Sequence, residues 1–209
     1  TSIEADTLTL GFQDDAYGTA TVTVTATSGA DSVTDTFTVT VTAVDDPPIN
    51  TVPGAQTVDE DTALAITDLS VNDVDGNLAT TQLTVTKGTL TVSLAAGATI
   101  NAGANASSTL TLSGTQTQIN AALATVSYQG NLNYHGDDTL TIVSSDSSGT
   151  PLTDSDTVEI TVTAVADAPI NTVPGPQTVA EDTALAITGL SVNDVDGNLA
   201  TTQLTVTKG

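Results

Sequence analysis

The sequence contains no cysteine, methionine or tryptophan, and aromatic residues make up only 2% of it. It can form no disulfide, and the lack of cysteine is compatible with either redox compartment. Its core has to be aliphatic. No apolar run approaches the roughly 18 residues that a membrane-spanning helix needs, so we expect no membrane insertion of these residues. The chain begins without Met and inside an alternating pattern, which predicts a piece of a longer protein.

Positive charge is almost absent. Lys and Arg together number two, Lys87 and Lys208, against 25 Asp and Glu, so the formal net charge is −23. Nucleic acids and anionic membranes are bound largely through cationic side chains, and the sequence excludes both as partners. Hydrophobic residues make up 38% of the chain, which favours a packed core over the disorder typical of weakly hydrophobic acidic chains. The acidic surface is expected to attract cations.

The sequence also lacks the residue sets that catalysis usually requires. His135 is the only histidine, and without cysteine there is no credible zinc set; we interpret it as a loop residue beside Gly136. No GxSxG motif and no glycine-rich phosphate loop occurs. Paired carboxylates alone do not indicate a catalytic cleft. We therefore predict a protein that is not an enzyme.

An internal repeat is the strongest feature of the chain. The segment 48–88 recurs at 169–209, an offset of 121 residues, with only three differences in 41 positions: Ala55/Pro176, Asp59/Ala180 and Asp68/Gly189. Such a period is a common size for one domain. We predict the end of one domain at residues 1–44, a complete domain at 45–165 and the start of another at 166–209. Prolines close the joints, which favours a semi-rigid array.

Alternation of apolar and polar residues dominates the complete unit, as expected for strands with one buried face. Thr115 to Ala124 is the only plausible helical turn, with Ile119, Ala122 and Leu123 at helical spacing. The pattern predicts an all-β fold of tandem antiparallel Greek-key β-sandwiches, with a β-helix or a jelly roll as alternatives. The expected strands are Gln56–Asp59, Leu64–Val71, Gln82–Thr86, Leu90–Leu94, Thr109–Leu112, Thr125–Tyr128, Thr139–Val143 and Thr157–Val165.

Acidic residues cluster at set places in the unit. They are the Asp59-Glu60-Asp61 run, the loop from Asn72 to Asn77 with its DxDGN sequence, and the joint Asp45-Asp46, which recurs as Asp167. Calcium prefers six to eight oxygen ligands from carboxylates, amides and backbone carbonyls. Asp, Gly and Asn also build ordinary turns, so the loop alone would be weak evidence. Together, the three clusters favour a calcium site.

The order of a Glu-Asp pair, a DxDGN loop and a closing Asp before Pro resembles cadherin-type repeats. It is most similar to the cadherin-like and immunoglobulin-like tandem repeats of large bacterial surface adhesins. The stretch from Asn133 to Ile142, followed by Asp146, is similar to the late-strand signature of those repeats. The likeness covers essentially the whole chain.

This resemblance implies calcium ions at the joints between domains. The ligands it implies at the first joint are Asp45, Asp46, Asp73, Asp75, Asn77 and Asp146. Those it implies at the second joint are Glu60, Asp61, Asp167, Asp194, Asp196 and Asn198; Glu181 repeats Glu60 in the later copy. Ala166 replaces Asp45 in the later joint, so we expect unequal sites.

The sequence therefore predicts a calcium-stiffened extracellular spacer, on a cell surface or secreted, within a bacterial adhesin or surface filament. Its expected partners are neighbouring repeats of the same protein, with head-to-tail self-association as a further expectation. The alternatives are a carbohydrate- or protein-binding module that uses exposed loops such as Ala95–Ser108, and an accessory β-domain of a secreted polysaccharide-active enzyme.

Overall fold

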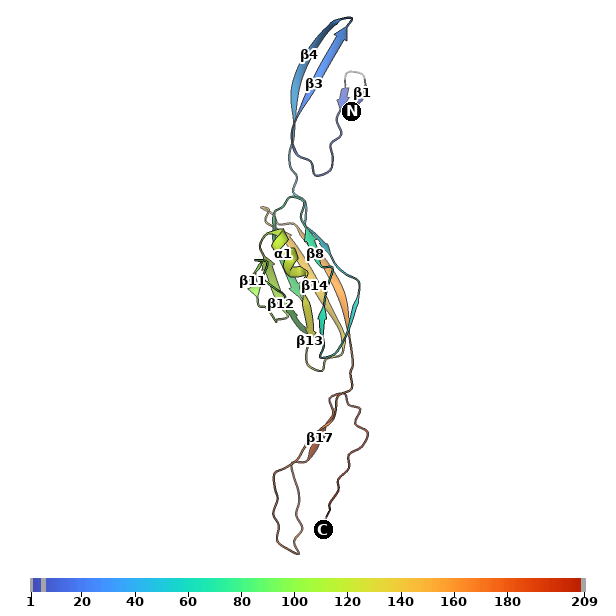
Figure 1. Cartoon of the computed structure of the whole chain (residues 1–209), viewed down its shortest axis with the longest axis vertical. Coiled ribbons are helices and arrows are strands. Elements are labelled where there is room, and N and C mark those ends of the chain that lie inside the picture. The colour runs from blue at the N-terminus through green and yellow to red at the C-terminus, as the bar shows by residue number, and fades with distance from the viewer. Residues whose placement is uncertain (1, 5–6, 208–209) are drawn as a thin grey trace.

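The computed structural model describes residues 2–4 and 7–207. Figure 1 shows an elongated chain with a compact β-sandwich at its centre, which we call the central sandwich (residues 45–165). A hairpin lies on one side of it, in the segment 7–44, called the head here. An extended segment, 170–207, lies on the other side and is called the tail. No helix among the described residues is long and apolar enough to cross a bilayer.

Two sheets and a separate strand pair build the central sandwich. The first sheet has six strands in the order β11 (Thr99–Gly103), β12 (Thr109–Ser113), β9 (Leu78–Thr84), β14 (Gly136–Asp146), β15 (Thr153–Thr163) and β6 (Gln56–Asp59). The second has three strands in the order β10 (Gly88–Thr91), β13 (Ser127–Gly130) and β7 (Ala63–Ala65). A short antiparallel pair joins β5 (Ile49–Thr51) to β8 (Ser70–Asn72). All strand pairs are antiparallel except β15–β6, which is parallel.

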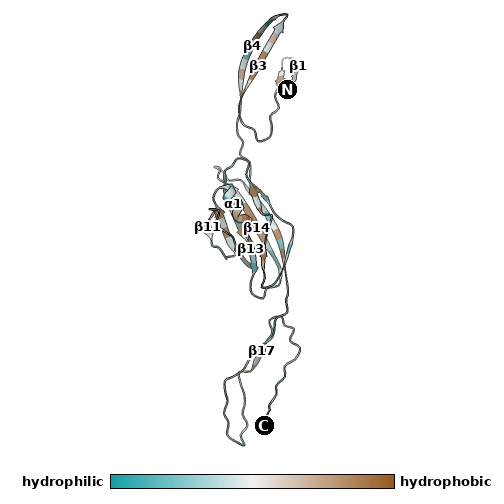
Figure 2. Ribbon diagram, in the orientation of Figure 1, coloured by the Kyte–Doolittle hydropathy of each residue, from teal (hydrophilic) through white to brown (hydrophobic). Residues whose placement is uncertain are grey.

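The core lies within the central sandwich and is aliphatic apart from Tyr128, as the composition requires. Alternation along the strands turns one face of each sheet inward, and Leu83, Leu140 and Ile160 of the larger sheet are almost completely buried. Figure 2 shows the resulting alternation of hydrophobic and hydrophilic residues along the strands. An all-β sandwich fold is thus observed, as the alternation predicted.

The single helix, α1 (Gln116–Leu123), forms where helical spacing predicted it. Thr115 is the N-cap: its hydroxyl accepts a hydrogen bond from the amide of Gln118, whose side chain accepts one from the amide of Thr115. This capping box pairs two amides that the first turn would otherwise leave without partners. Ile119, Ala122 and Leu123 are buried against the core.

The strand predictions need two corrections. Leu64–Val71 is not one strand but is interrupted between β7 and β8, because Asp68 adopts a left-handed conformation with φ of 63°. Such a residue breaks a ladder by turning the chain. The segment Ala95–Ser108 is not all loop, since it contains β11 at the edge of the larger sheet.

The head and the tail contain fewer strands than the central sandwich. The head contains β2 (Thr7–Thr9), β3 (Gly18–Ser28) and β4 (Asp31–Val41), with β3 and β4 paired as a long hairpin. The strand β1 (Ser2–Glu4) precedes the head and pairs with β2. The tail contains only β16 (Ile170–Thr172) and β17 (Ser191–Asn193), which pair as β5 and β8 do. Its remaining described residues form no strand.

Candidate cation-binding junctions

Acidic residues gather at both ends of the central sandwich. The first junction is the joint 45–48 together with the loop 73–77 that follows β8. The second junction is the joint 164–169 together with the loop 194–198 that follows β17. The two are related by the 121-residue repeat. Their side chains are described in turn below.

The loop 73–77 is built around Asp73, which is only 4% exposed. Its Oδ1 accepts hydrogen bonds from the amides of Asp75 (3.1 Å), Gly76 (2.9 Å) and Asn77 (3.4 Å). Gly76 takes a φ of 71°, a conformation that glycine adopts without steric cost. The turn therefore fixes one carboxylate oxygen of Asp73 and leaves Oδ2 buried without a partner.

Asp146 lies beside this loop at the end of β14 and is 2% exposed. Its Oδ1 accepts from the amides of Ser148 (3.1 Å) and Leu152 (3.0 Å) and from the Ser148 hydroxyl (2.9 Å). Burial raises the pKa of Asp146, but these hydrogen bonds outweigh burial and hold the pKa below its usual value. Its Oδ2 is buried without a partner, so an ionised carboxylate presents a free oxygen here.

The joint connects directly to the loop. The amide of Asp46 donates to Oδ2 of Asp75 at 2.7 Å, and Nδ2 of Asn77 donates to Oδ1 of Asp45 at 2.8 Å. The second contact turns Oδ1 of Asn77 away from Asp45, and that oxygen is also buried without a partner. The structure thus brings together the residues named for the first joint.

Electrostatic repulsion accompanies this arrangement. Burial raises the pKa of Asp46, and the negative charges of Asp15, Asp75 and Asp45 raise it further. A carboxyl whose pKa is raised by its neighbours is less stable in its charged form. A divalent cation placed among these oxygens would reverse that effect.

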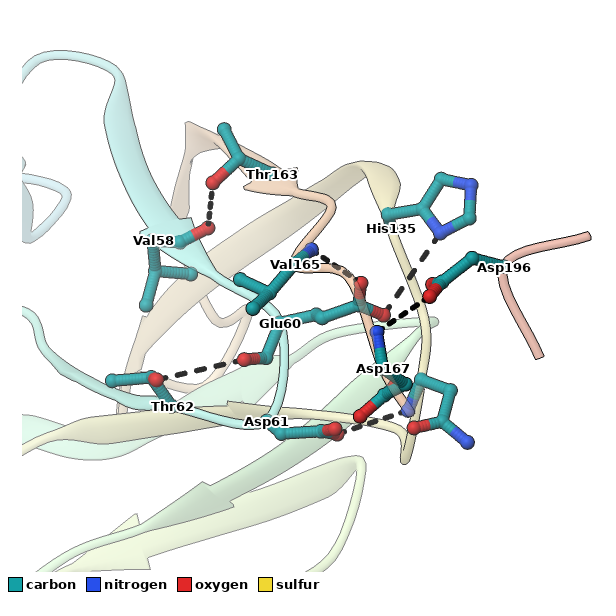
Figure 3. A network of polar contacts seen from close by, with 10 residues as sticks. Val58, Glu60, Asp61, Thr62, His135, Thr163, Val165, Asp167 and Asp196 are labelled. Carbon is teal, nitrogen blue, oxygen red and sulfur yellow. Dashed lines mark hydrogen bonds and ion pairs between the residues drawn. The ribbon is translucent and has the colours of Figure 1, made fainter. Parts of the chain in front are cut away.

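At the second junction the central residue is Glu60, at the end of β6 (Figure 3). It is 4% exposed, and its Oε1 accepts a hydrogen bond of 2.7 Å from the amide of Val165 in the joint. Its Oε2 has no hydrogen-bond partner and lies 3.9 Å from Nδ1 of His135. Burial of a carboxylate is costly unless its charge is compensated, and His135 compensates it only when protonated.

Asp167 ties the joint to the tail. Its amide donates to Oδ2 of Asp196 at 2.6 Å. Asp61 lies nearby (Figure 3), and its Oδ1 accepts a hydrogen bond from the amide of Asn133 at 2.9 Å. Burial raises the pKa of Asp167, and so do four negative charges, those of Asp196, Asp61, Glu60 and Asp194.

The tail loop repeats the turn of the first loop more loosely. The amide of Asn198 lies 3.4 Å from Oδ1 of Asp194, and the amide of Gly197 donates to the carbonyl of Asp194 at 3.3 Å. Glu181, the counterpart of Glu60, is exposed. Glu60 directly follows β6, which pairs with β15, whereas the corresponding residues 177–180 of the tail are paired with no strand among the described residues. The structure therefore does not bring Glu181 into either junction.

The donor chemistry fits a hard cation. Four buried oxygens at the two ends of the central sandwich lack hydrogen-bond partners, and each is an acceptor: Glu60 Oε2, Asp73 Oδ2, Asn77 Oδ1 and Asp146 Oδ2. Carboxylate and amide oxygens are the ligands that calcium prefers. Across residues 2–4 and 7–207, however, no three His, Cys, Asp or Glu side chains are arranged so that they could hold a metal ion. Binding would require these side chains to close together.

Two residues near the junctions were missed in the sequence. Asp15 in the head acts on Asp46 at the first junction, and nothing in its local pattern indicates this. His135 does occupy a loop, as predicted, yet the loop places it beside Glu60. A single histidine next to a glycine carries no signal of such a contact, because 75 residues separate it from Glu60.

One family model matches the chain. It is described as GEX2, "Protein GAMETE EXPRESSED 2 domain", and it matches residues 66–154, inside the central sandwich and less than half of the chain. No curated protein matches the sequence. The matched model does not describe a bacterial adhesin repeat.

Solved structures with similar features are cadherin extracellular regions. "Protocadherin Gamma B2 extracellular cadherin domains 1-5" is 17% identical, with a TM-score of 0.44 over 86% of this chain and 32% of that one. Domains 3-6 of the same protocadherin give 16% identity and a TM-score of 0.41, over 85% and 39% of the two chains. Human CDH23 EC21-23 gives 16% identity and a TM-score of 0.34, over 78% and 48%. Our chain thus spans about a third of the length of the first of these structures. Structural similarities with TM-scores below 0.5 do not identify a function.

Proposed function

We propose that the chain is a calcium-stiffened extracellular spacer, in which cations at the joints hold successive β-sandwich repeats in line. The observation that carries this proposal is the set of buried, unpartnered acceptor oxygens at both ends of the central sandwich. A buried carboxylate oxygen without a donor is unfavourable, and a bound cation would remove that cost.

At the first junction, the proposed ligands are Asp45, Asp46, Asp73, Asp75, Asn77 and Asp146. At the second junction they are Glu60, Asp61, Asp167, Asp194, Asp196 and Asn198. Glu181 would serve the corresponding junction of a further repeat. Calcium would supply two positive charges and would bridge oxygens from the joint and from the sandwich. The chain's own contribution is already visible without it: the hydrogen bonds to Oδ1 of Asp73 and Oδ1 of Asp146 fix each carboxylate and leave its Oδ2 free.

Stiffening follows from where the ligands lie. Asp45, Asp46 and Asp167 lie in the joints, whereas Asp73, Asp146 and Glu60 lie at the ends of strands β8, β14 and β6. An ion bound by both groups would oppose bending at the joint. The first junction retains Asp45, and the second has Ala166 in its place, so we propose tighter binding at the first. The repeat boundaries that we propose remain 1–44, 45–165 and 166–209.

This function places the protein outside the cell or on its surface, where millimolar calcium would keep such sites filled, and it involves no catalysis. Neighbouring repeats of the same protein are its proposed partners. A bacterial adhesin or filament stays a prediction that comes only from the sequence resemblance.

Isothermal titration calorimetry tests the proposal directly. Calcium added to the chelator-treated full chain should bind with a dissociation constant of about 10⁻⁴–10⁻³ M, the range of extracellular modules. Magnesium should bind more weakly, because it demands a smaller and more regular oxygen cage. Absence of calcium heat beyond that of dilution, at millimolar concentrations, would refute the proposal.

A further inference from the structure

Strand β8 has a partner strand on one edge only. It pairs with β5, and no strand among the described residues pairs with its other edge. Helix α1 lies against β8 instead (Figure 1). Buried main-chain amides and carbonyls need hydrogen-bond partners. The helix therefore has to supply for β8 what a second neighbouring strand would supply.

Two side chains of α1 provide these hydrogen bonds. The Oδ1 of Asn120 accepts from the amide of Val71 and its Nδ2 donates to the carbonyl of Val71, each at 2.8 Å. The Oε1 of Gln116 accepts a hydrogen bond of 2.9 Å from the amide of Asp73. Its Nε2 donates to Oδ1 of Asn72 at 3.2 Å. Asn120 and Gln116 thus take the place of peptide groups in a neighbouring strand.

The periodicities of helix and strand make this match possible. Gln116 and Asn120 are four positions apart, so they lie on one face of the helix, about 6 Å apart along its axis. Val71 and Asp73 are two positions apart at the end of β8, and two residues of extended chain span about 6.6 Å. The two spans are nearly equal, so one helix face meets two successive amides of the strand edge.

Asp73 is the residue around which the loop 73–77 is built. Its Oδ1 accepts hydrogen bonds from amides of that loop, and its own amide donates to Gln116, so both the side chain and the main chain are held. These contacts leave Oδ2 as the buried oxygen without a partner. Without the hydrogen bond to Gln116, the main chain at Asp73 would be free to rotate, and the direction of Oδ2 would no longer be set.

We propose that Gln116 is a positioning residue for cation binding at the first junction, and that it acts through Asp73. The helix gives it a firm support, because Ile119 and Leu123 are completely buried in the core and Asn120 ties the helix to β8. A loop that already has its binding conformation keeps its full affinity, whereas a loop that has it only part of the time loses affinity in proportion. This inference rests on the proposed function, since it gives Gln116 a role at that cation site.

Amide hydrogen exchange of the full chain in chelator tests the positioning role without calcium. In Gln116→Leu the amide of Asp73 loses its acceptor and should exchange about tenfold faster than in the wild type, or more. Gln116→Glu keeps an acceptor oxygen at the same reach and should retain slow exchange. Thr117→Leu, at the next and exposed position of the helix, is the matched control and should leave the exchange of Asp73 unchanged.

Calorimetric titration of Gln116→Leu and Thr117→Leu tests the effect on binding. Loss of one hydrogen bond that orders the loop should weaken calcium binding about threefold to tenfold in Gln116→Leu, and Thr117→Leu should bind as the wild type does. Melting in chelator separates positioning from general destabilisation. Gln116 is only half-buried, so its substitution should change that melting temperature little, whereas the further rise caused by calcium should be smaller than in the wild type.

Three results would overturn the inference. They are unchanged exchange of the Asp73 amide in Gln116→Leu, calcium affinity of that variant equal to that of the wild type, and an equal loss of affinity in Thr117→Leu. If the wild type itself bound no calcium, the proposed function would be refuted. The exchange measured in chelator would then still decide whether Gln116 fixes Asp73.

Discussion

The main-chain amide of Asp167 donates a 2.6 Å hydrogen bond to Oδ2 of Asp196. The same bond occurs 121 residues earlier, from the amide of Asp46 to Oδ2 of Asp75, at 2.7 Å. Each joint is thereby anchored to the acidic loop that follows it. The pKa of the joint aspartate is raised by burial and by nearby carboxylates in both places. Like charges are held together at each junction, which is the condition under which a divalent cation stabilises a fold.

Calcium should raise the melting temperature of the chain. At about 5 mM calcium and a dissociation constant of about 10⁻⁴–10⁻³ M, mass action adds about 1–2 kcal/mol per site. For a domain of this size that corresponds to a shift of about 3–10 °C. Differential scanning calorimetry measures it, with sodium chloride of equal ionic strength as the control. Equal shifts in both salts would reduce the effect to charge screening.

Replacing Asp73 and Asp75 together with Asn should lower calcium affinity at least tenfold, because two charges leave the first junction. Asp31 and Asp35 provide a matched control, since both lie exposed on hairpin β3–β4. Asp31→Asn with Asp35→Asn removes the same charge far from the junctions and should leave affinity almost unchanged. Calorimetric titration compares the two double variants. Similar affinities would mean that the loop 73–77 is only a turn.

Asp167→Asn should have opposite effects with and without calcium. In chelator at pH 7 it removes a repelling charge and should raise the melting temperature. The pKa of Asp167 is raised in the folded chain. The repulsion of its charge therefore destabilises the fold above that pKa, and this destabilisation disappears as pH falls through the folded pKa to the pKa of the unfolded chain. The gain in melting temperature from Asp167→Asn should shrink over the same pH range. In saturating calcium the same variant should melt lower than the wild type. A variant that melts higher in both conditions would remove Asp167 from the site.

Asp138→Asn should destabilise the central sandwich by about 2–3 kcal/mol. Asp138 is buried, and its carboxylate accepts hydrogen bonds from the amides of Thr86, Lys87 and Thr139. Burial raises its pKa, but these hydrogen bonds outweigh burial and lower it. The stabilisation that Asp138 provides is therefore complete above its pKa in the unfolded chain, and it is lost as pH falls through its pKa in the folded chain. Urea unfolding from pH 3 to 7 checks this.

The neighbouring Asp137 is exposed, and Asp137→Asn is the matched control for that series. It should change the free energy of unfolding by well under 1 kcal/mol. The series compares the free energy of unfolding of Asp138→Asn with that of the wild type. If the difference stayed constant from pH 7 to pH 3, Asp138 would not be ionised as we infer.

Leu83→Ala and Leu204→Ala make the same change in the same local sequence. Leu83 is completely buried, so its truncation should cost about 2–5 kcal/mol through lost burial and the cavity left behind. Leu204 is 79% exposed, and its truncation should leave unfolding of the central sandwich unchanged at low protein concentration. Equal losses for the two variants would show that the tail is packed as the central sandwich is.

Much of the fold and of the junctions could be predicted from the sequence. Alternation located most of the strands, because a strand with one buried face needs it, and helical spacing located α1. The acidic pattern pointed to Asp45, Asp46, Asp73, Asp75 and Asn77, which the structure brings together at one end of the sandwich. The position of His135 beside Glu60 could not be predicted, since it depends on how two distant loops pack.

The repeated segment separates what the sequence alone determined from what tertiary structure decided. A strand pair with both strands inside the segment forms in both copies: β5 pairs with β8 as β16 pairs with β17. The turn from Asp73 to Gly76 likewise recurs from Asp194 to Gly197, with the same 3.3 Å hydrogen bond. The partners in these contacts lie at most 23 positions apart, so the repeated segment contains everything that the contacts require.

Strands whose pairing partners lie outside the segment form only once. Residues 78–84 are strand β9, paired on both sides by β12 and β14, whereas the identical residues 199–205 form no strand. Alternating Leu and Thr residues allow a strand but cannot supply the amide and carbonyl groups that a ladder needs. Glu60 and Glu181 differ for the same reason, since only Glu60 has Val165 beside it. The sequence alone determined which residues could be strands or buried junction carboxylates, and long-range pairing decided which segments formed strands and which carboxylates were buried.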